Sequence, residues 1–350
     1  MTSIHTLALP RGIRPTRKYL MGATAILLAV TQAAPAWAIA GLPTKERHEL
    51  ASAQTTSQSI WYSTSPWSER QADLRDALAN GKSVTPGVWT KGVLGRTLRN
   101  TDSIGGYGQK TWGVVAGIDF GSEGVLAAGD AMIFGVSAGH INSDVDFSNS
   151  NDTSNYEGWV GGVYATYIRG GFFIDTTLKY NRLEMEYNGT SGGGYRVTPD
   201  VETIGGQIDV GQRFDVSGNV FIEPLATLAY AETSTDSFTV GGTTASFEDA
   251  KSLKASIGAR LGKVLNRSEG AIVTATLTAR VWNEFEGDNT ARFSNGVTQV
   301  SDDFGGAYGD VGGGLEVTGM NGVSAFVATG VKFKSDYTDA SIKIGARLNF

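Results

Sequence analysis

The chain has 350 residues, of which 47 are Gly and none is Cys, and its formal net charge is −6 at pH 7. The absence of cysteine excludes disulfide scaffolds, thiolate zinc sites and cysteine nucleophiles. The chain contains only three histidines, so we expect no metal site and no other cofactor. Its acidic balance argues against a nucleic-acid partner.

The N-terminal segment has the three parts of a secretory signal peptide. Residues 11–18 contain four positive charges, and the apolar run Leu20–Val30 separates them from Ala36-Trp37-Ala38. That run is about half of the roughly 20 residues that a spanning helix needs. We therefore expect residues 1–38 to be removed, with cleavage after Ala38 and with Ala36 and Ala38 as the small residues that are recognised.

The segment 39–86 is too short for an enzyme or adhesin domain. Its longest uncharged run, Leu50–Ser68, consists mainly of Ser, Thr and Gln and is too polar for a spanning helix. The sequence Ser68-Glu69-Arg70-Gln71 resembles a capping box, and Gly81 follows Asn80. These signals predict a short polar helix over 69–80.

From residue 87 to Phe350, polar and apolar residues alternate with a period of two, and Gly, Asn, Asp and Ser separate the alternating segments. This pattern predicts antiparallel β-strands in one all-β domain, 87–350. Long and short connections alternate, as they do in outer-membrane barrels with short periplasmic turns. The twelve predicted strands are 88–97, 110–120, 130–141, 156–169, 172–187, 201–214, 219–231, 249–262, 270–283, 304–318, 323–333 and 338–350.

A soluble β-sandwich would also alternate, so the choice depends on where the charges fall. A charge on the lipid face of a barrel costs up to about 2–4 kcal/mol at the bilayer midplane. Here the charges share the polar parity of their strands, except in the first strand, where Lys91 and Arg96 have opposite parities. We therefore expect a membrane barrel with a charged lumen, to which we assign Lys179, Arg213, Glu223, Arg260, Arg280 and Arg347.

The C-terminus Lys343-Ile344-Gly345-Ala346-Arg347-Leu348-Asn349-Phe350 resembles the signal that the barrel assembly machinery reads, in which Lys343, Gly345, Leu348 and Phe350 occupy the constrained positions. Together with Trp89-Thr90-Lys91-Gly92 and Phe221-Ile222-Glu223-Pro224, it makes residues 87–350 similar to the translocator barrel of the autotransporters, the type V secretion family. The resemblance implies a 12-stranded outer-membrane barrel in a Gram-negative bacterium. It also implies outer-membrane lipid as surroundings, with periplasmic chaperones and the assembly machinery as partners during biogenesis.

In that family a helix before the first strand lies in the pore, and the resemblance assigns this place to 69–80; a periplasmic helix or a simple linker is the alternative. Family members often cut themselves at an Asn-Asn pair, which this sequence lacks. We therefore expect no processing beyond signal-peptide removal, and a minimal passenger.

The function we expect is that of an integral outer-membrane barrel of the translocator type, monomeric and without enzymatic activity. Two alternatives remain open: a porin-like channel, and a structural or adhesive surface protein whose loops 232–248 and 284–303 bind ligands. The run Asp144, Asp146, Ser148, Ser150 and Asp152 has the spacing of a calcium loop, but Asn149 and Asn155 replace its Gly and Glu. We interpret it as a solvated outer loop.

Overall fold

The computed structural model describes residues 41–64, 84–101, 105–267, 271–294, 299–319 and 322–350. The predicted signal peptide, with Ala36 and Ala38, and the predicted helix 69–80 lie outside these residues. Within the described residues, two helices precede the strands, α2 (Thr44–Ala51) and α3 (Ala53–Ser63). No helix among the described residues is long and apolar enough to cross a bilayer.

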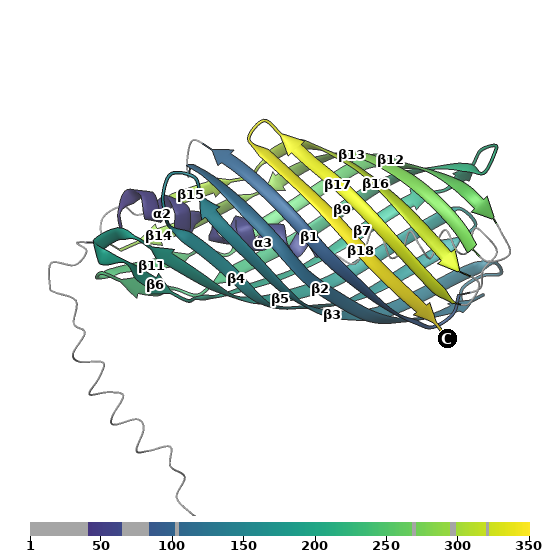
Figure 1. The fold of residues 1–350 in the computed structure, drawn as a ribbon, viewed down its shortest axis with the longest axis horizontal. Coiled ribbons are helices and arrows are strands. Elements are labelled where there is room, and N and C mark those ends of the chain that lie inside the picture. Colours follow the sequence, from purple (N-terminus) through teal and green to yellow (C-terminus); the bar gives the residue numbers. More distant parts are fainter. Residues whose placement is uncertain (1–40, 65–83, 102–104, 268–270, 295–298, 320–321) are drawn as a thin grey trace, which may run out of the picture. The chain divides into compact units, whose positions relative to one another are not determined.

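Twelve long antiparallel strands form a closed barrel (Figure 1). The ring closes where β1 pairs with β18, from Gly87 opposite Asn349 to Arg99 opposite Tyr337. The prediction of a 12-stranded barrel is confirmed, with one observed strand for each predicted strand. The barrel strands are β1 (Gly87–Thr101), β2 (Gly105–Glu123), β3 (Asp130–Phe147), β4 (Thr153–Arg169), β5 (Phe172–Gly189), β7 (Asp200–Gln212), β9 (Val220–Thr235), β12 (Ala250–Arg267), β13 (Ala271–Glu286), β16 (Gly306–Gly319), β17 (Val323–Lys334) and β18 (Tyr337–Asn349).

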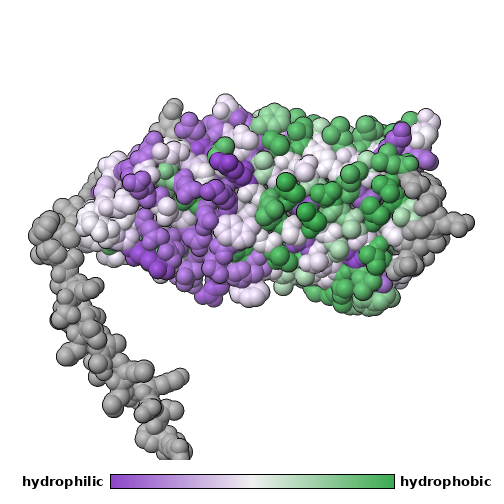
Figure 2. Space-filling model, in the orientation of Figure 1, coloured by the Kyte–Doolittle hydropathy of each residue, from purple (hydrophilic) through white to green (hydrophobic). Residues whose placement is uncertain are grey.

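Several strands are longer than predicted, most of them at the end away from the short turns, which we call the outer end; β12 is instead longer at its inner end, by 263–267. β2 has 19 residues, and at ~3.3 Å per residue and a tilt of ~40° it rises roughly 48 Å along the barrel axis. An apolar band of about 25 Å is enough to cross the membrane. Figure 2 shows this division: hydrophobic side chains gather over one half of the visible face and hydrophilic ones over the other. The alternating pattern underestimates the length of these strands, because the side chains on both faces are polar where a strand extends beyond the lipid.

The first strand, in which Lys91 and Arg96 have opposite parities, also keeps charges away from the lipid face. Lys91 is 1% exposed and points inward, whereas Arg96 is exposed on the outside. In the register of β1 and β2, Leu94 is opposite Trp112 and Arg96 is opposite Lys110. Arg96 therefore lies two residue pairs beyond the exposed Trp112, on the side of the polar outer half, where a charge on the outer surface costs little.

Two outer connections pair with each other to form a second sheet. β10 (Phe238–Val240), β11 (Thr243–Phe247), β14 (Asp288–Phe293) and β15 (Val300–Asp303) are joined in that order. In Figure 1 this sheet and α2 lie at the end of the barrel opposite the C-terminus. We call the sheet the cap. Two short strands complete the described fold, β6 (Tyr195–Val197) beside β5 and β8 (Phe214–Asp215) beside β9.

The largest hydrophobic cluster lies inside the outer half of the barrel. Leu42, Leu50 and Ile60 are each at most 1% exposed and belong to one cluster with wall and cap residues. The wall contributes Tyr156, Leu183 and Tyr187, and the cap contributes Ala245, Phe293 and Val300. The helices α2 and α3 are therefore packed within the lumen.

Candidate functional site: the occupied lumen and its outer mouth

Polar side chains of α3 bind the inner wall of the barrel. Gln54 donates from Nε2 to the carbonyl oxygens of Thr233, at 3.1 Å, and Glu248, at 2.7 Å. The hydroxyls of Ser57 and Thr203 are 3.0 Å apart. Ser and Thr favour helices weakly because their side chains compete for backbone hydrogen bonds. These contacts with the wall, together with burial, therefore stabilise the helix in this place.

Lys179 of β5 binds the C-terminal end of α3, where Lys179 and Trp61 of the helix each donate a hydrogen bond to the other. Trp61 Nε1 donates to the carbonyl oxygen of Lys179 at 3.2 Å, and Lys179 Nζ donates to the carbonyl oxygen of Trp61 and, at 2.9 Å, to Thr64 Oγ1. Lys179 Nζ also lies 4.4 Å from the centroid of the Trp61 ring. A hydrogen-bond donor is favourable here because the last carbonyl groups of a helix have no partner within the helix.

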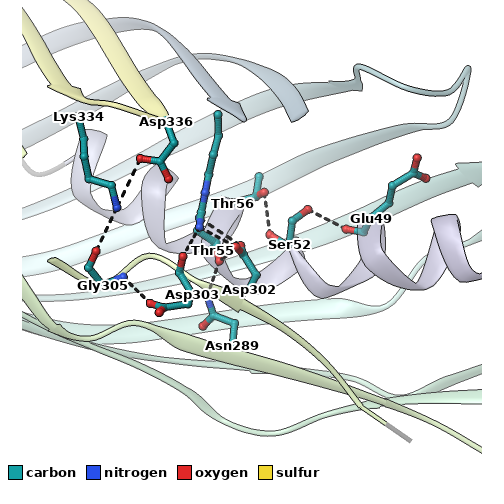
Figure 3. Close-up of polar contacts among 11 residues, drawn as sticks. Glu49, Ser52, Thr55, Thr56, Asn289, Asp302, Asp303, Gly305, Lys334 and Asp336 are labelled. Carbon is teal, nitrogen blue, oxygen red and sulfur yellow. Dashed lines mark hydrogen bonds and ion pairs between the residues drawn. The ribbon is translucent and has the colours of Figure 1, made fainter. Parts of the chain in front are cut away.

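The cap holds the N-terminal half of α3 through a buried polar cluster (Figure 3). Thr55 Oγ1 donates to Asp302 Oδ2 at 2.5 Å, and Asn289 Nδ2 donates to Thr55 Oγ1. Arg99 of β1 pairs with Asp302 at 2.7 Å, and both side chains are 0% exposed. Residues of the barrel wall, the cap and α3 therefore meet in one buried charged cluster. Nearby, Lys334 Nζ donates to the carbonyl oxygen of Gly305 at 3.0 Å.

A cavity of about 250 Å3 remains beside α3, on the side of β13, β16, β17 and β18. Small side chains leave this space open: the lining includes Gly312 and Gly314 of β16 and Thr276 and Thr278 of β13. Charges of both signs line it, among them Arg280, Lys332, Asp310 and Asp339. The cavity also reaches Asp175 of β5 and Asp209 of β7, so the helices leave part of the lumen unfilled.

The structure places five of the six predicted lumen charges on the inner face. Lys179, Glu223, Arg260 and Arg347 are at most 8% exposed, and Arg280 is half-buried and lines the cavity. Arg260 Nε pairs with Glu223 Oε2 at 2.6 Å. Arg213 differs, because it follows the last residue of β7. It pairs with Asp215 at 3.0 Å and lies over the Phe221 ring.

Arg347 links the last barrel strand, β18, to β2 and to the segment before β1. Its Nη2 lies 2.8 Å from Asp119 Oδ1 of β2 and donates to the carbonyl oxygen of Thr85 at 2.9 Å. Asp119 also accepts from the hydroxyl of Tyr164 at 3.0 Å, and Tyr164 accepts from Trp89 Nε1 at 2.8 Å. This network crosses the seam between β18 and β1 at the inner end of the lumen.

The four residues predicted as the assembly signal divide between the two faces of β18. Leu348 and Phe350 are 48% and 67% exposed on the outside, and Lys343 lines the cavity. Gly345 lies beneath the Phe326 ring, where an added Cβ would be 2.3 Å from a ring carbon. A side chain at this position would displace that ring. Their recognition by the assembly machinery stays a prediction.

Sequence reasoning missed the helices at 44–63. The run Leu50–Ser68 is uncharged, contains no Gly, and has its only Pro at residue 66. This lack of helix breakers before Pro66 is the signal that could have indicated a helix. The interpretation of residues 144–152 as a solvated loop is wrong at both ends. Asp144 and Asp146 belong to β3, whereas Asp152 is 1% exposed and Ser150 donates to Glu49 Oε1 at 2.7 Å.

The model of the family described as Autotransporter beta-domain matches residues 88–330. The chain belongs to the autotransporter β-domain family. Its curated relatives include pertactin autotransporters, with that of Bordetella bronchiseptica 30% identical over 244 residues, which are 68% of this chain and 25% of the relative. The autotransporter adhesin/invasin TibA of Escherichia coli is 31% identical over 205 residues, which are 56% of this chain and 20% of TibA. The chain thus spans about a quarter of the length of the pertactin relatives.

Solved autotransporter barrels have the same fold. The β domain of the Bordetella autotransporter BrkA superposes with a TM-score of 0.61 at 20% identity, covering 76% of this chain and all of that chain. The translocator domain of NalP from Neisseria meningitidis gives 0.64 at 14% identity, covering 86% and 99%. The fold comparison and the family match together make this chain an outer-membrane barrel domain of the autotransporter translocator type.

Proposed function

We propose that this barrel carries its own N-terminal segment through the lumen to the cell surface and that the segment then closes the lumen. The course of the chain supports this proposal. Leu42 donates from its backbone N to Thr243 Oγ1 of the cap at 3.3 Å, and Thr85 accepts from Arg347 at the inner end. Of the described residues, Leu42 therefore lies at the outer mouth and Thr85, just before β1, lies at the opposite end, as expected for a segment passed outward through the barrel.

The proposal includes the route to the membrane. Residues 1–38 act as a cleaved signal peptide, periplasmic chaperones keep the exported chain unfolded, and the assembly machinery recognises Lys343, Gly345, Leu348 and Phe350. The barrel is a monomer surrounded by lipid. The exposed Leu348 and Phe350 at the end of β18 support recognition of this strand, because pairing with another sheet edge needs few specific side chains. The role requires no catalytic chemistry, and we propose that the chain is not an enzyme.

Single-channel conductance in planar bilayers tests the closed lumen. We expect the refolded full chain to be closed and a variant that lacks residues 41–64 to give stable openings, because α2 and α3 fill the outer half of the lumen. Lys110→Met is the control, because Lys110 is exposed on the outer surface and does not contact either helix. Equal, steady conductance of the full chain and the deletion variant would contradict the proposal.

A porin-like channel is the second candidate, because the cavity of about 250 Å3 is lined by charges of both signs. In such a channel, lumen charges set ion preference. The same recordings distinguish the two functions, since a diffusion pore conducts with α2 and α3 in place.

A further inference from the structure

The outer end of α2 carries two carboxylates that are buried against the barrel wall. Glu46 is 0% exposed and Glu49 is 4% exposed, one helical turn apart. A third carboxylate, Asp152 in the connection between β3 and β4, is 1% exposed. Buried carboxylates are stable only when they are paired, protonated or hydrogen-bonded.

Each carboxylate accepts hydrogen bonds from a different part of the wall. Glu49 accepts from Ser150 Oγ and from the Tyr187 hydroxyl, both at 2.7 Å. Glu46 accepts from the Tyr195 hydroxyl at 2.7 Å and from Ser191 N at 3.1 Å. α2 is therefore attached to the wall through acidic side chains and hydroxyl groups.

Asp152 is held in its ionised form. It accepts from Thr190 N at 2.8 Å and from Thr190 Oγ1 at 2.5 Å, and Lys45 Nζ lies 3.2 Å from its Oδ2. Burial opposes ionisation of Asp152, but these hydrogen bonds outweigh burial and lower its pKa. Its negative charge therefore faces Glu49 at every pH near neutrality.

Glu49 shows the opposite behaviour. Burial and, to a smaller extent, Asp152 together raise its pKa to about 7, against the hydrogen bonds from Tyr187 and Ser150. Asp152 on the neighbouring connection and Tyr187 on β5 are the ionisable groups that act on Glu49 directly. The other ionisable side chains of α2 are Lys45, Glu46, Arg47 and His48, and Tyr195 of β6 donates to Glu46. Of the cations, Lys45 pairs with Asp152 and Arg47 lies over the Phe293 ring.

We propose that Glu49, Asp152 and their hydroxyl partners form a proton-dependent latch that holds α2 in the outer mouth. When α2 is docked, Glu49 keeps a proton that it shares with the ionised Asp152. Loss of that proton places two buried negative charges side by side and favours release of α2. The inference rests on the proposed plug and adds a condition for its release: acid keeps the outer mouth closed and alkali loosens it.

The sign follows from the two states of Glu49. Released into water, Glu49 has the ordinary value of 4.5, and docked it has a pKa of about 7. The proton therefore favours docking fully below 4.5, and this contribution is lost as the pH rises through 7. Each unit of pKa difference is tenfold in the docking equilibrium, so the equilibrium constant falls roughly 50-fold between about pH 5 and about pH 8.

Cysteine labelling tests the latch, because the chain contains no cysteine. The probe is Ala51→Cys on α2, a position that is 2% exposed, in the refolded full chain with a membrane-impermeant maleimide. Its labelling rate is divided by that of Thr239→Cys, an exposed cap position, which removes the pH dependence of the thiol itself. We expect this ratio to rise roughly 50-fold from about pH 5 to about pH 8.

Two variants separate the latch from other causes. Glu49→Gln mimics the protonated side chain and is expected to keep the ratio low and constant with pH, whereas Glu184→Gln, at an exposed glutamate on β5, is expected to leave the rise unchanged. A low ratio at every pH with Glu49 present, or a rise that persists in Glu49→Gln, would overturn the latch and leave the plug intact. A high ratio at every pH would show that α2 is not docked and would overturn both proposals.

Asp152→Asn provides a further variant if Glu49→Gln does not fold. It removes the negative charge beside Glu49 and is expected to move the midpoint of the rise to lower pH. An unmoved midpoint would overturn the latch.

Discussion

Trp61 and Lys179 donate hydrogen bonds to each other's backbone carbonyl, so that a lumen helix and the fifth predicted strand are joined in both directions. The two residues are separated by 118 positions in the sequence. Lys179 is buried at 4% exposure, and its Nζ donates to two oxygen atoms at the end of α3.

Lys179→Met is expected to loosen the plug. A hydrogen bond contributes about 0.5–1.5 kcal/mol, and Lys179 Nζ makes two to the end of α3, so docking of α3 weakens on the order of 10- to 100-fold. Channel recordings then show brief openings that the native chain lacks. Lys110→Met serves as the matched control, and a closed Lys179→Met channel would show that other contacts suffice.

Gly205→Ala is expected to displace Trp61 and to destabilise the barrel. An added Cβ at Gly205 would lie 2.8 Å from Trp61 Cζ2 and 2.4 Å from the carbonyl oxygen of Tyr230. Overpacking of this kind costs about 1–3 kcal/mol. Urea unfolding of the refolded chain measures the change. Gly161→Ala is the control, because its added Cβ meets Ser137 O at 3.7 Å, an ordinary contact.

Arg347→Leu is expected to weaken the seam by about 3–5 kcal/mol, because it leaves Asp119 buried at 1% exposure without its cation. The double variant with Asp119→Leu removes the uncompensated charge and recovers much of the loss. A double-mutant cycle in urea separates the coupling from the single losses. If the two losses simply added, the pair would not act as a unit.

Val163→Lys is expected to cost about 2–4 kcal/mol, because it places a charge on the lipid face near the middle of the band. Val163 is 50% exposed and is opposite Val136 and Leu178, which are also exposed. Thr153→Lys lies at the outer end of the same strand and is expected to change stability by less than about 0.5 kcal/mol. Unfolding from lipid vesicles distinguishes them, and equal losses would place the membrane elsewhere.

Much of the barrel could be predicted from the sequence because a strand's side chains alternate between lipid and lumen. Ile342, Ile344 and Leu348 share one parity and are all exposed outward, and Lys343 and Arg347 share the other and face the lumen. The lipid face tolerates few charges, so this alternation is strict wherever the strand crosses the bilayer. Strand number, closure and family therefore followed from local patterns.

The contents of the lumen depended on tertiary structure. The helix α3 has no apolar stripe that marks it, and its polar side chains find partners far along the chain: Gln54 binds a carbonyl 179 positions away, and Thr55 binds a carboxylate 247 positions away. The sequence pattern predicts a solvated Asp152, but α2 covers this residue in the structure. The pairing of two outer connections into the cap likewise required the barrel to bring them together. A pattern read over ten residues reports the solvent on each face of a strand, but it cannot report which distant segment replaces water inside the ring.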